Sequence, residues 1–413
     1  MTKFFLTGSG TPCSPVRLPL MAAVAGILAF LPGLSSATPI PVSAELSAKI
    51  AATTQGAILN MGDLPLPTLP ELDYTKTPGG PPYIFSDNPE YLRVADCAAL
   101  REPVDPGVFR IYTYHVNGTT GTISKITTVM ENKGKAPMNV RYLRRANAGP
   151  STNYYLVGKQ GMSRFLKAQP EVNPSITIPA GSSAVLDPYK EEARIKFDEL
   201  IHSFHDIQID QPGVITVLQT PPDNDSVEAS KRITTVIPPK NFGAGRGRFP
   251  FSEYQVTVHG PDGAGSAFDT AQGPAQIIVA DGKRDPWMEG KDTELNTTVA
   301  LKGNYGVIYD IEIPYTSSNG KSVAVMVFNA RTGAKWCDNM AAAIGVGPGK
   351  FDSGIVDVPT GYTYVTGLDT AVLLQVLPPT EKQEIARIRF TPPGASCLPV
   401  PILLIPFDAK AGQ

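Results

Sequence analysis

The chain is 413 residues long, and its 36 lysines and arginines nearly balance its 38 aspartates and glutamates, giving a formal net charge of −2. A charge so close to neutral gives no electrostatic reason to expect nucleic acid or an anionic membrane as a partner. With 40 prolines, 38 glycines and 18% charged residues, the composition favours a turn-rich protein over one built from long helices.

The first 37 residues have the pattern of a secretory signal peptide. Lys3 and Arg17 precede an apolar run over 18–31, which is too short to span a bilayer comfortably. Small residues then lead up to Ala37, as a secretory peptidase requires. We therefore expect residues 1–37 to be cleaved, leaving a secreted or cell-envelope protein without a stable membrane span. The alternative, an uncleaved anchor helix, would need about 20 apolar residues.

Residues 38–84 read as a proline-rich spacer. One short helix is possible around 44–58, and six prolines then fall between residues 65 and 82. Prolines at that density favour an extended, semi-rigid segment.

Residues 85–220 are expected to form a first β-sandwich domain, because short runs rich in valine, isoleucine, threonine and tyrosine alternate with turn residues. The runs 108–116 and 123–131 flank Asn117-Gly118, which is the strongest short signal for a β-hairpin. The turn at 180–182 separates two further runs and is expected to cross between sheets.

A linker is expected at 221–247, where prolines, glycines and charged residues gather. The segment 248–413 then offers a second series of strands, each four to nine residues long, with one short helix expected at 337–344. Parallel α/β folds need helices of about 10–15 residues between their strands, and none is visible. The predicted fold is all-β, with two immunoglobulin-like antiparallel β-sandwich domains following the signal peptide and the spacer.

The cysteines allow one disulfide after export. Cys13 leaves with the signal peptide, whereas Cys97, Cys337 and Cys397 remain. Cys337 and Cys397 fall in the same predicted domain and are the expected pair. Three free, buried thiols are the alternative, because spacing alone cannot establish connectivity.

Five short motifs are spread over residues 86–407: Ser86-Asp87-Asn88-Pro89-Glu90, Tyr114-His115-Val116-Asn117-Gly118-Thr119, Asn147-Ala148-Gly149-Pro150-Ser151, Gly303-Asn304-Tyr305-Gly306-Val307-Ile308-Tyr309 and Pro393-Gly394-Ala395-Ser396-Cys397-Leu398-Pro399-Val400. In these motifs the chain resembles a family of secreted, mainly Gram-positive bacterial β proteins that often carry an appended copper amine oxidase N-terminal (stalk) domain. The resemblance implies an envelope or extracellular β protein without an assigned activity.

The residues do not support copper or amine oxidation. A copper amine oxidase needs three histidines on the metal and a tyrosine in an Asn-Tyr-Asp/Glu setting, but here Gly306 follows Asn304-Tyr305 and the chain has four histidines in all. The stalk domain's own motif is also not visible. We therefore expect no cofactor and no catalytic residue, and we interpret Gly303-Asn304-Tyr305-Gly306 as a structural turn that needs a positive φ and opens a strand.

Two groups of polar residues could suggest a site. His202 and His205 have spacing that could hold a metal on a helix, but on a strand residues three apart face opposite sides, so we expect ordinary surface or edge histidines. The carboxylate pairs Asp281/Asp285 and Glu289/Asp292 lie in a polar loop, where solvated acids or a loose calcium site are more typical than glycosidic catalysis.

Aromatic residues are the remaining functional signal. Trp287, Trp336, Tyr362 and Tyr364 fall in or near loops of the second predicted domain, where exposed rings stack on sugars or anchor partners; burial in the core is the alternative. We expect an exported, non-catalytic binding or scaffolding protein whose partner is a cell-wall polysaccharide or another envelope protein. The alternative is an extracellular hydrolase of polysaccharide or peptidoglycan, which would need a cleft with two carboxylates about 5–10 Å apart.

Overall fold

The computed structural model describes residues 39–173, 176–240, 244–331 and 338–410, and residues 39–413 belong to one compact unit. Among the described residues there are twenty-five strands and four α-helices, so the protein is all-β, as the sequence predicts. No helix in these ranges is long and apolar enough to cross a membrane. The predicted signal peptide, 1–37, lies outside the described residues.

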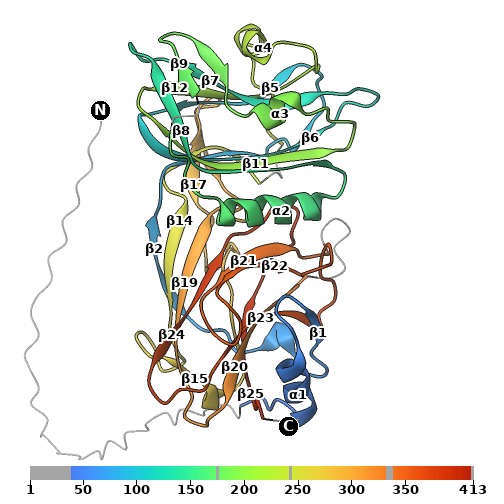
Figure 1. Cartoon of the computed structure of the whole chain (residues 1–413), viewed down its shortest axis with the longest axis vertical. Coiled ribbons are helices and arrows are strands. Elements are labelled where there is room, and N and C mark those ends of the chain that lie inside the picture. The colour runs from blue at the N-terminus through green and yellow to red at the C-terminus, as the bar shows by residue number, and fades with distance from the viewer. Residues whose placement is uncertain (1–38, 174–175, 241–243, 332–337, 411–413) are drawn as a thin grey trace, which may run out of the picture. The chain divides into compact units, whose positions relative to one another are not determined.

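Two sheets of mostly antiparallel strands form the upper part of Figure 1. The four-stranded sheet has the order β10 (Ser183–Val185), β7 (Lys125–Asn132), β12 (Gly213–Thr220), β5 (Cys97–Val104). The nine-stranded sheet has the order β18 (Thr297–Ala300), β17 (Glu289–Asp292), β13 (Arg246–Phe249), β3 (Tyr83–Ser86), β6 (Gly107–Asn117), β11 (Leu200–Ile209), β8 (Met138–Ser151), β9 (Ile176–Ile178), with β4 (Tyr91–Leu92) beside β6. Isoleucines from both sheets, such as Ile111 and Ile215, share one buried cluster.

Two further sheets form the lower part. The seven-stranded sheet has the order β2 (Tyr74–Gly79), β14 (Glu253–Val258), β19 (Ile308–Thr316), β24 (Glu384–Phe390), β21 (Ala342–Val346), β22 (Gly354–Val358), with β15 (Phe268–Asp269) beside β19. The five-stranded sheet has the order β1 (Ile58–Asn60), β23 (Thr370–Leu377), β20 (Ser322–Phe328), β25 (Ile402–Phe407), β16 (Ala275–Ile277). Their inner faces contribute to one large buried cluster.

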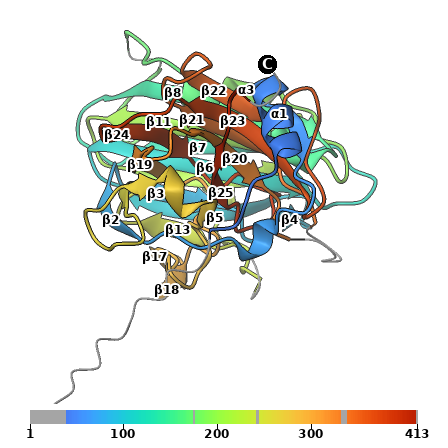
Figure 2. The same cartoon turned by 90° about the horizontal axis from the view of Figure 1, so that it is seen from below.

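The helices cover particular faces of these sheets. They are α1 (Ala44–Ala52), α2 (Tyr154–Lys167), α3 (Pro188–Glu192) and α4 (Ser226–Arg232), with 3₁₀ turns at Leu66–Thr68 and Thr270–Gln272. Figure 2 shows α1 beside β20 and β23 of the five-stranded sheet, and side chains of α1 and these strands share a buried cluster. In Figure 1, α2 lies between β11 above and β21 and β22 below, and it contacts all three strands.

Burial patterns follow from this layering. Every residue of β20 is buried, because the five-stranded sheet is covered on one face by the seven-stranded sheet and on the other by α1. Strand β24 instead alternates exposed and buried residues from Ile385 to Phe390, as expected for a sheet with one face in solvent. A mostly apolar strand such as β20 is therefore covered on both faces, whereas an alternating strand such as β24 is covered on one face.

The strand pairings do not follow the predicted domain limits. Strand β2 and the first half of β3 come from the predicted spacer, 38–84. Strand β2 pairs with β14, and β3 pairs with β6 and β13, so this segment is folded into the sheets. Strands β13, β17 and β18 come from beyond residue 245 but belong to the nine-stranded sheet. The predicted linker, 221–247, holds α4, which packs on the four-stranded sheet.

Two local predictions have different outcomes. The runs on either side of Asn117-Gly118 become β6 and β7, but they belong to different sheets, so the predicted hairpin is wrong and this connection crosses between layers. The turn at 180–182 does cross between sheets as predicted, because β9 pairs with β8 whereas β10 pairs with β7. The helix expected at 337–344 is also wrong over its described part, where β21 begins at Ala342.

A fully buried arginine ties the layers together. Arg110 of β6 donates from Nε and Nη2 to the Asp206 carboxylate of β11, at 2.6 and 3.0 Å. Its Nη2 also donates to Glu253 Oε1 at 2.7 Å, and its Nη1 donates to the Ser252 carbonyl at 3.1 Å. The guanidinium carbon lies 5.2 Å from the centre of the Phe165 ring on α2. One side chain thus connects the nine-stranded sheet, the start of β14 and α2.

We expect Arg110→Met to lower the free energy of unfolding by about 3–5 kcal/mol, because it leaves the buried Asp206 carboxylate without its main partner. The matched control is Arg389→Met, which breaks a pair with Asp310 in which the arginine side chain is 43% exposed. That change should cost less than about 1 kcal/mol. Urea unfolding followed by fluorescence measures both, and equal losses would contradict the role given to Arg110.

Candidate ligand-binding groove

Helix α2 is the element that shapes the site, and it was not predicted from the sequence. Asn153 caps its first turn by accepting a hydrogen bond from the backbone N–H of Leu156 at 3.1 Å. Arg164 and Lys167 stand in its last turn, where positive charge stabilises the carboxyl end of a helix. The capping asparagine and the basic last turn can be recognised in the sequence. The glycines inside the helix, however, lower its intrinsic helix propensity.

The inner face of α2 explains those glycines. A Cβ added to Gly158 would lie 2.4 Å from the carbonyl oxygen of Gly394, and one added to Gly161 would lie 2.1 Å from the His202 ring. Beyond them, the Phe165 ring stacks on Phe204 with centroids 3.7 Å apart. The missing side chains let the helix approach the sheet closely, which holds its opposite face against the loop after β22.

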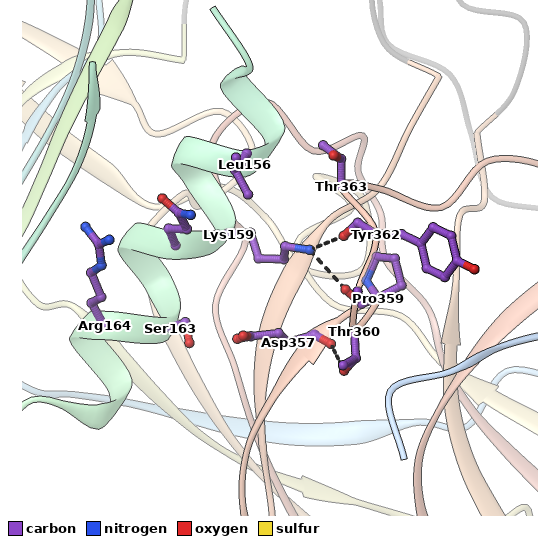
Figure 3. Close-up of a pocket in the computed structure, with 11 residues that line it drawn as sticks. Leu156, Lys159, Ser163, Arg164, Asp357, Pro359, Thr360, Tyr362 and Thr363 are labelled. Carbon is purple, nitrogen blue, oxygen red and sulfur yellow. Dashed lines mark hydrogen bonds between the residues drawn. The ribbon is translucent and has the colours of Figure 1, made fainter. Parts of the chain in front are cut away.

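The buried side chain of Lys159 holds the loop after β22 in place by binding its backbone carbonyls. Lys159 is only 6% exposed, and its Nζ donates hydrogen bonds to the carbonyl oxygens of Pro359 at 3.0 Å and Tyr362 at 2.5 Å (Figure 3). Burial lowers the pKa of the Lys159 ammonium from its usual value, and the Asp357 carboxylate acts in the opposite direction. The lysine therefore serves as a clamp between α2 and residues 359–362.

A polar hollow of about 440 Å³ lies between the helix and the loop. Its lining comes from α2 and from the end of β22 with the following loop: Leu156, Lys159, Gln160, Ser163, Arg164, Asp357, Pro359, Thr360, Gly361, Tyr362 and Thr363. Asp357 Oδ1 lies 3.9 Å from Lys167 Nζ and has no hydrogen-bond partner among the described residues. We name this the polar hollow.

An aromatic hollow of about 320 Å³ lies at the amino end of α2 and is lined by Thr152, Asn153, Tyr154, Tyr155 and Tyr364. The rings of Tyr155 and Tyr364 contact one another with centroids 5.3 Å apart and planes tilted by 57°. The hydroxyl of Tyr154 is held by hydrogen bonds to Asp198 Oδ1 at 2.9 Å and to the Tyr91 hydroxyl at 2.8 Å. Tyr154 and Tyr155 are thus presented by α2, and Tyr364 by the loop after β22. The two hollows together are called the groove below.

The predicted aromatic residues separate in the structure. Tyr364 lines the aromatic hollow and is 42% exposed, whereas Tyr362 lines the polar hollow, is 68% exposed and has a ring that points away from α2 in Figure 3. Trp287 is half-buried over Gly282 and lines neither hollow. Trp336 lies outside the described residues. Tyr154, Tyr155 and Lys159 were missed because they belong to the unpredicted helix.

The structure describes one of the two cysteines of the predicted disulfide. Cys397 is disulfide-bonded, and Cys97 is a free thiol buried on β5. Cys337 lies outside the described residues, so the pairing of Cys337 with Cys397 stays a prediction.

The turn at 303–306 is a buried structural element. Gly303, Asn304 and Gly306 have positive φ angles, and β19 begins at Ile308. Asn304 accepts a hydrogen bond from the Met288 N–H at 2.9 Å and donates one to the Tyr309 hydroxyl at 2.8 Å. The Tyr305 carbonyl accepts a hydrogen bond from the Tyr83 hydroxyl at 2.8 Å, so the turn joins two sheets.

The histidines expected at the surface are buried instead. His202 and His205 lie on the central strand β11 and face opposite sides, as their spacing requires: His202 contacts the Tyr112 ring, and His205 Nε2 lies 3.2 Å from Asp187 Oδ2. Burial lowers the pKa of His202 to about 3, so its ring is neutral near pH 7. The described residues contain no group of three or more His, Cys, Asp or Glu side chains that could hold a metal ion.

Two of the carboxylates expected to be solvated are also buried. Asp285 accepts hydrogen bonds from the Tyr309 hydroxyl at 2.6 Å and the Ala280 N–H at 2.7 Å, and it pairs with Lys76. Asp292 pairs with buried Arg246 at 2.7 Å. Their partners account for their burial, since a buried charge needs compensation.

No protein-family model matches the chain, and a comparison with curated protein sequences finds no match.

We expect Lys159→Met to release the loop, because it keeps the aliphatic stem and removes two charge-assisted hydrogen bonds. Amide hydrogen exchange over residues 359–364 should become about tenfold faster or more. Lys167→Met is the control, since its ammonium lies 3.9 Å from Asp357 and is half-exposed. Exchange that is unchanged by Lys159→Met, or equally raised by both changes, would contradict the clamp.

Proposed function

We propose that this protein is an exported, non-catalytic binding or scaffolding protein of the cell envelope or extracellular space, and that its groove binds a saccharide. The single observation that carries the proposal is the aromatic hollow, where Tyr154, Tyr155 and Tyr364 stand beside polar side chains. A sugar ring has an apolar C–H face and a rim of hydroxyls, which matches an aromatic surface next to hydrogen-bonding groups. A cell-wall polysaccharide fits this chemistry better than a folded envelope protein.

The proposed location rests on the sequence. The basic start, the short apolar run and the small residues before Ala37 are the features of a signal peptide. The sheets that pack face to face are compatible with two immunoglobulin-like sandwiches, which is the architecture we propose for them. The resemblance to secreted β proteins with an appended amine oxidase stalk domain points to the same class of exported protein.

The hydrolase alternative is less well supported by the groove. Asp357 is the one carboxylate among the described lining residues of the two hollows, whereas glycosidic hydrolysis uses two carboxyl groups about 5–10 Å apart. A buried acidic pair, Asp87 and Glu90, lines neither hollow. Burial raises the pKa of both, that of Glu90 to about 7. We therefore favour binding over catalysis.

The test is equilibrium binding of the mature protein to soluble fragments of cell-wall polysaccharide. Tyr364→Ala should weaken binding about tenfold or more, because covering one aromatic ring contributes about 1.5–3 kcal/mol. Tyr189→Ala is the control, since this tyrosine is equally exposed, at 42%, and lines neither hollow. It should change affinity by less than about twofold.

Equal effects of the two tyrosine changes would contradict the assignment of the aromatic hollow. Release of new reducing ends during incubation would favour the hydrolase instead.

A further inference from the structure

The two hollows lie along a single helix. Thr152 and Asn153 precede α2, and the lining residues within the helix are Tyr154, Tyr155, Leu156, Lys159, Gln160, Ser163 and Arg164. The positions from 156 onward recur at intervals of three and four, which places them on one helical face. From Tyr154 to Arg164 the helix rises about 15 Å, at roughly 1.5 Å per residue. The groove is therefore long enough for several sugar rings in a linear chain.

Positive charge gathers at one end of this face. Lys159 and Arg164 line the polar hollow against a single carboxylate, Asp357, and Lys167 follows one turn after Ser163. The chain as a whole carries −2, so the excess of cations here is local. Lys159 is occupied by the carbonyls of the loop, which leaves Arg164 as the exposed cation of the lining.

Arg164 is suited to hold an acidic group. Its Nη1 donates to the Asn147 carbonyl, which anchors the guanidinium on β8. A guanidinium has five N–H donors in a planar fork, so it can hold this carbonyl and still bind a carboxylate or phosphate. The aromatic surface lies at the amino end of α2 and this cation lies at the carboxyl end. The two ends of the groove therefore offer different contacts to a ligand.

Resting on the saccharide-binding function proposed above, we propose that the groove selects an acidic linear saccharide. A sugar ring of the chain stacks in the aromatic hollow, and an acid group further along meets Arg164. The shared chemistry is a saccharide with an anionic substituent, which can be a carboxylate or a phosphate. A cation in the last turn also stabilises the helix itself, so the test must separate binding from helix stabilisation.

The experiment measures the affinity of the mature protein for three soluble probes at low and high salt. The probes are an oligogalacturonide, its neutral methyl ester, and a phosphorylated oligosaccharide. We expect the oligogalacturonide or the phosphorylated probe to bind at least tenfold more tightly than the ester at low salt, and whichever binds more tightly identifies the acid group. The preference should shrink as salt screens the charges.

Arg164→Gln should reduce the preference to within about twofold while leaving the affinity for the neutral ester unchanged. The control is Arg232→Gln, which removes an arginine that is 57% exposed from the last turn of α4. It shares the helix-stabilising role and should leave the preference intact.

Three results would overturn the inference. Equal affinity for acidic and neutral probes contradicts the selection and leaves saccharide binding standing. A preference that survives Arg164→Gln shows that the acid group binds elsewhere. Binding of none of the probes removes the inference together with the proposed function.

Discussion

The positions of the layers depend on the contacts of Arg110. A guanidinium buried away from water is tolerated only where its charge and its N–H groups have partners, and here Asp206, Glu253 and the Ser252 carbonyl supply them. These partners belong to β11 of the nine-stranded sheet and to the start of β14 of the seven-stranded sheet. These two sheets therefore cannot slide past one another without breaking the hydrogen bonds of Arg110. Phe165 lies over the same guanidinium, so α2 is held relative to both sheets. The groove inherits its shape from this arrangement, since one of its walls is α2 and the other follows β22.

Most strands could be predicted from the sequence because their signals are local. Alternating burial in β24 and continuous burial in β20 both follow from short patterns of apolar residues. The partner of each strand is not a local property, and this is why the Asn117-Gly118 signal misled. That turn has the composition of a hairpin, but β6 pairs with β11 and β3 whereas β7 pairs with β12 and β10. The same limit applies to the predicted domains, since β13 completes a sheet that begins more than 150 residues earlier in the chain.

The site was only half visible in the sequence. Tyr364 could be found because it lies in a loop rich in turn residues, and it does line a hollow. Helix α2 could not, because Gly158 and Gly161 weaken its helical pattern, and the reason for them is a close approach to Gly394 and His202 that only the folded chain creates. The predicted exposure of several polar residues was wrong for a related reason. A histidine or a carboxylate is expected at the surface unless the partner that permits its burial is known. His205 with Asp187, and Asp285 with Tyr309, are such pairs. Their polar atoms are bonded within the fold, whereas Tyr155, Tyr364 and Arg164 line the hollows along α2.

We propose that a linear saccharide lies along α2, with a ring on the tyrosines and an acid group at Arg164. A crystal structure of the protein with a bound acidic oligosaccharide would decide this. We expect density for a sugar ring in contact with Tyr155 and Tyr364, continuing over Ser163 to the guanidinium of Arg164. A saccharide bound elsewhere, for instance against Trp287 with the groove empty, would contradict it.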